Sequence, residues 1–151
     1  MERYPNGFDR RRLNDVIRNN LSCLYSLHVA NQALEFDAGM QAQVSIKSES
    51  EALIAEYRRE LKQTRQDVAA QLPQSIMING WLEVVDSNGV NGGLEAEGHM
   101  FEIEDVDVEM VDEIGRPELF LYLADRPASS ESTRYRWRYN DQEWTLPEHE
   151  S

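Results

Sequence analysis

Hydrophobic residues in the first half of the chain recur at the three- and four-residue spacing of an α-helix. The pattern starts after Asp9 and fades near Gly39, where glycine favours a helix end because it tolerates the left-handed backbone. A first long helix is therefore predicted between these two residues. Its apolar stripe consists of Leu13, Val16, Ile17, Leu21, Leu24 and Leu27.

A second apolar stripe with near-heptad spacing follows and stops at Pro73. Charged residues interrupt it between Lys47 and Glu51, and Ser48 with Glu51 has the spacing of a capping box. The second helix is therefore predicted to begin either near Met40 or near Ser48, and Pro73 ends it because proline cannot continue a helix. The stripe consists of Met40, Val44, Ile54, Tyr57, Leu61, Val68 and Leu72.

These two helices predict a hairpin over residues 1–73. Arms of about 25 to 33 residues span roughly 35 to 50 Å, so they reach past a small sheet. The overhanging part of the apolar stripe then needs another surface to pack against. We expect that surface to be a second copy of the chain, which gives a homo-oligomer, in the simplest case a dimer, through the helices. In the alternative arrangement, both arms cover one face of the sheet.

After Pro73 the hydrophobic period changes to two, which indicates β-strands. Glycine and asparagine between residues 86 and 93 predict a long flexible connection whose amides could also wrap a small anion. The chain is thus predicted to be α+β, with an antiparallel meander of about five strands at 74–151 that forms one folded unit with the hairpin. The strands are expected at 75–85, 100–110, 119–123 (apolar on both faces and buried), 134–139 and 143–146, the last two forming a hairpin.

The segment from Met100 to Met110 contains a break in its alternation. Phe101 and Ile103 share one face, whereas Val106 and Val108 would fall on the other face of an unbroken strand. A β-bulge or a tight corner at residues 104–105 would return all of these apolar side chains to one face. The acidic side chains of the segment then gather on the opposite face.

Charge divides the chain into two unlike parts. The 28 acidic residues exceed the 15 basic residues and give a formal net charge of -13. Residues 1–73 hold ten acids and ten bases, whereas residues 74–151 hold 18 acids and five arginines, so the sheet carries the whole excess. A field of this sign opposes direct binding to nucleic acid or to an anionic membrane, and neither is predicted as a partner.

The remaining composition predicts neither a cofactor nor a disulfide. Cys23 is the sole cysteine, and no Cys/His cluster has zinc spacing. The sequence shows no secretory signal and no apolar run long enough for a membrane span, which predicts a cytoplasmic location. Asp105, Asp107 and Glu109 occupy alternate positions, but such positions on a strand do not converge on one ion, so no metal site is predicted.

Candidate catalytic groups are few. Cys23 is predicted to be an inert core thiol among the apolar neighbours of the first helix. His99 stands between Glu97 and Glu102, and we interpret it as a solvated histidine beside acids. The chain is therefore predicted to be non-enzymatic.

Arginines and aromatic residues alternate in the run RYRWRY, so Arg134, Arg136 and Arg138 point to one face of a strand. If this strand lies next to the acidic one, the arginines form an internal ladder of ion pairs. The alternative is a site for a small nucleotide or another anion, formed by the three arginines together with Trp137. Guanidinium and aromatic groups bind phosphates and bases well.

The acids are densest between Glu95 and Glu118, where ten of them accompany only Arg116. The predicted function is an acidic inhibitor or adaptor, such as mobile elements encode, whose sheet docks on a basic, nucleic-acid-binding protein as a polyanion mimic. The simpler alternative is a structural oligomer with a solvated acidic surface. The residues predicted to contact the partner are Glu95, Glu97, Glu102, Glu104, Asp105, Asp107, Glu109, Asp112 and Glu113.

Overall fold

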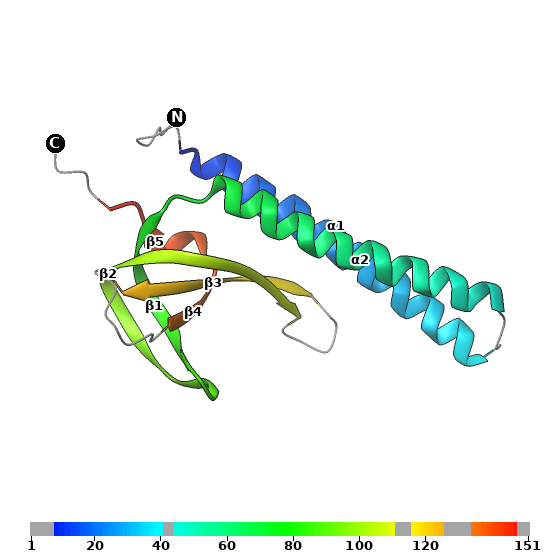
Figure 1. Ribbon diagram of the computed structural model, residues 1–151. Helices are drawn as coiled ribbons and strands as arrows, with labels where there is room; N and C mark the ends of the chain where they lie inside the picture. Colours follow the sequence, from blue (N-terminus) through cyan, green and yellow to red (C-terminus); the bar gives the residue numbers. More distant parts are fainter. Residues whose placement is uncertain (1–7, 41–43, 111–115, 126–133, 148–151) are drawn as a thin grey trace.

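The computed structural model describes residues 8–40, 44–110, 116–125 and 134–147. Two helices precede five antiparallel strands, which confirms the α+β prediction of an N-terminal hairpin and a C-terminal sheet (Figure 1). The elements are α1 (Arg10–Met40), α2 (Val44–Gln71), β1 (Ser75–Asp86), β2 (Gly89–Met110), β3 (Pro117–Asp125), β4 (Arg134–Arg138), the 3-10 turn η2 (Asp141–Glu143) and β5 (Trp144–Thr145).

The two helices end where local sequence favours it. The Asp9 side chain caps α1, because its Oδ1 accepts a hydrogen bond of 3.2 Å from the backbone amide of Arg12. α2 begins at Val44, between the two predicted starts, and ends at Gln71, just before Pro73. The arms of 31 and 28 residues are therefore about 46 and about 42 Å long.

The strands pair in the order β2-β3-β4-β1-β5, and an additional pairing between β1 and β2 closes the first four into a ring. β2 serves two neighbours, because its first part pairs with β1 as far as Glu102 and its second part pairs with β3 from Phe101 onward. The sheet therefore curls strongly, as Figure 1 shows. The buried core includes Ile76, Ile78, Leu82, Phe101, Leu119, Leu121, Leu123 and Trp137.

The hairpin joins this core along the part nearest the sheet. Leu13, Ile17 and Leu24 of α1 and Val68 of α2 belong to the same hydrophobic cluster as the strands, and Tyr57 and Leu61 of α2 pack against it. The rest of the hairpin extends away from the sheet (Figure 1). Each arm thus packs against the sheet along part of its length and extends beyond it with the rest, so the predicted overhang is observed.

A register shift in the β2–β3 pairing confirms the predicted bulge. Ile103 pairs with Leu123, whereas Asp105 pairs with the adjacent Tyr122, so residue 104 is the extra one. Val106 returns to the core as a result and is 4% exposed. Burial of a single face of β2 therefore sets the position of the bulge.

The predicted long loop between the first two strands is wrong. Ser87 and Asn88 form a tight turn between the paired Asp86 and Gly89, and residues 91–93 continue β2. Gly89 supplies the positive φ of 104° for this turn. The Asp86 carboxylate accepts the amide of Asn88 at 2.8 Å, and this bond does most to hold the pKa of Asp86 below its ordinary value. A carboxylate thus occupies the place that the sequence suggested for a bound anion.

The predicted final hairpin is also wrong, because β5 pairs with β1 rather than with β4. The 3-10 turn η2 carries the chain back across β1. Glu143 of η2 lies against Gly80 and accepts a hydrogen bond of 3.0 Å from Nε1 of Trp137. A Cβ on residue 80 would collide with this carboxylate, so glycine lets η2 lie on β1 and deliver β5 to its edge.

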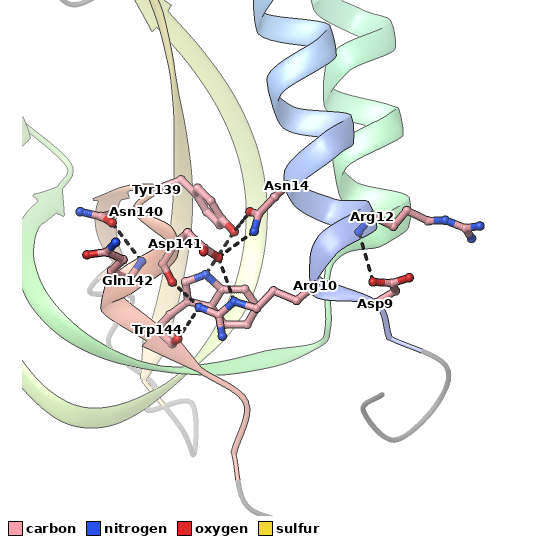
Figure 2. A network of polar contacts seen from close by, with 9 residues as sticks. All are labelled: Asp9, Arg10, Arg12, Asn14, Tyr139, Asn140, Asp141, Gln142 and Trp144. Carbon is pink, nitrogen blue, oxygen red and sulfur yellow. Dashed lines mark hydrogen bonds and ion pairs between the residues drawn. The ribbon is translucent and has the colours of Figure 1, made fainter. Parts of the chain in front are cut away.

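A polar network joins the start of α1 to the C-terminal turn (Figure 2). Arg10 Nε lies 2.8 Å from Oδ1 of Asp141, and the guanidinium stacks 4.0 Å from the centroid of the Trp144 ring. Asn14 donates to the same carboxylate at 2.8 Å and accepts from the Tyr139 hydroxyl at 2.6 Å. Burial alone would raise the pKa of Asp141, but the hydrogen bonds from Arg10 and Asn14 leave it lowered. This network helps to set the angle at which the hairpin leaves the sheet.

Candidate functional site

The arginines of β4 and the acids of β2 share the outer face of the sheet, but β3 lies between their strands. The predicted ladder between neighbouring strands is therefore wrong in its geometry, and the arginines reach across β3 instead. Arg136 pairs with Glu83 at 2.9 Å and also with Glu109, and its guanidinium lies 3.7 Å from the centroid of the Phe120 ring. Phe120 points outward yet is 2% exposed because this guanidinium covers it.

The other members of the run RYRWRY have separate roles. Arg134 pairs with Glu104 at 2.9 Å, whereas Arg138 is exposed. Trp137 is fully buried on the inner face. The structure thus brings together the three arginines predicted for an anion site but places Trp137 on the opposite side of the sheet. A phosphate at Arg136 would have to displace two carboxylates.

The predicted acidic partner surface is divided by these internal pairs. Glu104 and Glu109 bind arginines of β4, and Asp107 binds Arg65 of α2 at 2.7 Å. These carboxylates stabilise the fold and are partly neutralised by their partners.

The remaining members of the predicted surface differ in exposure. Glu102 is half-buried, and Asp105 is exposed while its Oδ1 accepts the amide of Val106 at 2.8 Å. Glu95 and Glu97 are both exposed, and within the described ranges neither forms an ion pair. Asp112 and Glu113 lie outside the described residues.

An exposed tryptophan lies opposite Glu95 on the long β1–β2 hairpin. Trp81 of β1 is 57% exposed and pairs directly with Glu95, and Val90 near the turn is 53% exposed. Directly opposed residues such as Trp81 and Glu95 share one face of the sheet, with their Cβ atoms about 5 Å apart. Glu97 lies on the same face, about 7 Å further along β2 than Glu95. We call Trp81, Val90, Glu95 and Glu97 the arm face.

Gly93 allows the Trp81 ring to lie against β2. A Cβ on residue 93 would collide with that ring and with the carbonyl oxygen of Leu82. The sequence pattern counted Trp81 among the apolar residues of a strand and missed its exposure. The glycines that face this strand were the available signal, because an aromatic ring often covers glycine on an outer strand surface.

Next to the arm, acidic and aromatic side chains line a hollow of about 370 Å³. Asp125 lies 2.9 Å from Nε2 of His99 and accepts a hydrogen bond of 3.0 Å from the Tyr135 hydroxyl. Burial, then Asp125 itself, raises the pKa of Tyr135, so the hydroxyl is a neutral donor rather than a base. Phe101 contributes a wall, 4.7 Å from His99 between ring centroids. The sequence placed His99 beside acids but did not identify Asp125 or Tyr135, which become its neighbours only through the β2–β3–β4 pairing.

Cys23 is exposed, which corrects its predicted place in the core. The neighbouring Leu24 takes the buried position on α1 instead. Partial burial and the nearby Glu60 and Glu56 raise the thiol pKa, so Cys23 is protonated at neutral pH. Within the part of the chain that the structure describes, no group of three or more His, Cys, Asp and Glu side chains is arranged to hold a metal ion.

Comparisons with protein-family models, with curated proteins and with solved structures found no match. None of the helices among the described residues has the length and apolar character needed to cross a membrane. The arm face and its surroundings are therefore the candidate functional site.

Proposed function

We propose that this chain is a non-enzymatic acidic interaction protein whose sheet binds a basic protein surface of the kind that nucleic-acid-binding proteins present. The supporting observation is the arm face, where the exposed Trp81 lies opposite Glu95 and Glu97 follows on the same face of β2. Tryptophan is enriched among the residues that dominate binding energy at protein interfaces.

The chemistry of the arm face suits an arginine or lysine side chain of the partner. A cation over the indole face gains about 0.5–2 kcal/mol from the ring quadrupole. Glu95 is close enough to the Trp81 ring to accept hydrogen bonds from the same guanidinium or ammonium group. Val90 extends the contact with apolar area.

Net charge contributes to this binding in a different way. The excess of 18 acids over five arginines in residues 74–151 attracts a basic protein and speeds its encounter. Carboxylates already paired with arginines, such as Glu104 and Glu109, add little local attraction. Specific recognition therefore falls to the arm face rather than to the whole acidic segment.

The test measures binding of an oligo-arginine peptide of about nine residues by tryptophan fluorescence of the full chain. Trp137 and Trp144 are 0% and 2% exposed, so quenching by a soluble ligand reports on Trp81. We expect Trp81→Ala to weaken peptide binding roughly 5- to 30-fold. Binding to this variant is measured by calorimetry, because the substitution removes the fluorescent reporter. Its fold should be retained because the side chain is mostly exposed.

The matched controls separate the arm face from bulk charge. Glu95→Gln with Glu97→Gln removes two charges at the arm face, and Glu51→Gln with Glu56→Gln removes two exposed charges from α2. We expect the first pair to weaken binding roughly tenfold and the second by less than about twofold. Equal losses in both pairs, together with full affinity of Trp81→Ala, would show that the acidity is only a solvated surface.

A further inference from the structure

The apolar stripe of the hairpin continues past the point where the sheet covers it. Among the described side chains, Leu24 is the last buried one along α1 and Thr64 is the first buried one along α2. Between these points and the tip, apolar residues keep their helical spacing, and those whose side chains are described are half-buried or, like Val29, exposed. Two such helices shield each other on one side only, which leaves apolar surface along the hairpin.

A groove of about 230 Å³ runs between the helices in this region. Leu27 of α1 and Ile54, Tyr57 and Leu61 of α2 form its apolar lining, and Arg58 is an exposed residue at its rim. Burial raises the pKa of Tyr57, and its hydroxyl lies 3.8 Å from Sδ of Met110 at the end of β2. The groove thus starts where the sheet stops.

We propose that this groove binds the hairpin of a second copy of the chain in an antiparallel four-helix dimer. Charge argues for this occupant, because residues 1–73 carry ten acids and ten bases and so do not repel their own copy. The sheets, with 18 acids against five arginines each, repel one another. An antiparallel arrangement places the sheets at opposite ends of the bundle, separated by more than the screening distance of about 8 Å.

The available area is enough for a reversible dimer. Two helices side by side present a strip about 20 Å wide, and the free part of the hairpin is about 25 Å long. The footprint is therefore about 500 Å² on each copy, or about 1,000 Å² in total, near the lower limit for a specific interface. We expect a Kd of about 1–100 µM rather than a permanent dimer.

The experiment is analytical ultracentrifugation of the full chain from about 1 to about 300 µM. Ile54→Glu places a charge in the groove, and Ala55→Glu places the same charge on the adjacent exposed residue. We expect Ile54→Glu to raise the Kd at least about tenfold and Ala55→Glu to change it less than about twofold. Circular dichroism of each variant establishes that the hairpin is folded.

A second pair of variants covers the case in which Ile54→Glu unfolds the hairpin. Arg58→Glu reverses a charge at the rim, and Arg59→Glu reverses one on the neighbouring residue, with both side chains exposed. The proposal is supported if Arg58→Glu weakens dimerisation and Arg59→Glu does not. A chain that stays monomeric at every concentration overturns it, as does a dimer that the groove variants leave unchanged. A large fall in the Kd of dimerisation in about 1 M salt would indicate that the two sheets lie side by side, and this result would refute the antiparallel arrangement.

Discussion

Removal of the Arg136 side chain should destabilise the fold, because that side chain has two roles on the outer face. It covers Phe120, and Arg136→Ala would expose roughly 60 Å² of the Phe120 ring. This exposure lowers the free energy of unfolding by about 1.5 kcal/mol. Arg136 also pairs with Glu83 and Glu109, whose side chains are 31% and 46% exposed, so each pair contributes about 0.5–1 kcal/mol. The expected loss is about 3 kcal/mol, less than for a fully buried pair because both carboxylates can regain water.

Arg136→Met separates the two roles, because methionine retains an apolar stem over Phe120 but carries no charge. We expect the loss of both ion pairs in Arg136→Met to cost about 1–2 kcal/mol, and the exposed Arg138→Ala to cost less than about 0.5 kcal/mol. Urea unfolding followed by circular dichroism measures these differences, and Tm should fall by about 2–4 °C for each kcal/mol. In about 1 M salt, the cost of Arg136→Met should shrink while its difference from Arg136→Ala persists.

Two results would refute this account of the outer face. If Arg136→Ala changes stability by less than about 0.5 kcal/mol, the arginine neither covers Phe120 nor anchors the carboxylates in solution. If Arg136→Met is as damaging as Arg136→Ala, the cover of the ring contributes nothing. The first result would also free Arg136 for the anion site that the sequence suggested, whereas the second would leave it held by its two ion pairs.

Two further predictions concern pH and a glycine. Burial raises the pKa of Tyr139 from 10.0 to about 12, so the folded state keeps this proton to a higher pH than the unfolded state. The free energy of unfolding should therefore be unaffected below about pH 10 and fall by about 1–2 kcal/mol towards pH 12. Urea unfolding between about pH 9 and about pH 11.5 measures this decline, which should be shallower in Tyr139→Phe. An equally steep decline in the variant would mean that other groups cause it. Gly93→Ala should cost about 1–3 kcal/mol in thermal unfolding, because its Cβ meets the carbonyl oxygen of Leu82 as well as the movable Trp81 ring, whereas a neutral result would mean that the arm relaxes freely.

The elements that could be predicted from sequence are those governed by short-range periodicity. The spacing of apolar residues over 1–73 indicates two helices because each helix buries one stripe. The bulge at residue 104 was predictable for a related reason, since Ile103 and Val106 must both face the core. In each case the constraint lies within one element and needs no knowledge of its neighbours.

Several errors concern pairings between distant segments. β5 pairs with β1 because Glu143 fits over Gly80, and no local pattern near residue 143 indicates that contact. The internal use of Glu109 likewise depends on Arg136 reaching across β3. The exposure of Trp81 was missed because a strand aromatic has the same local pattern whether it faces the core or solvent.

The two proposals predict opposite responses to salt, and together they determine the stoichiometry of binding. Contact at the arm face is electrostatic and should weaken as salt rises, whereas association through the apolar groove should persist. An antiparallel dimer holds its two arm faces at opposite ends of a bundle, too far apart for one short basic segment to bridge. Each copy should therefore bind one peptide with the same affinity in monomer and dimer. A rise in affinity on dimerisation would mean that the two arms lie together and would contradict the antiparallel arrangement.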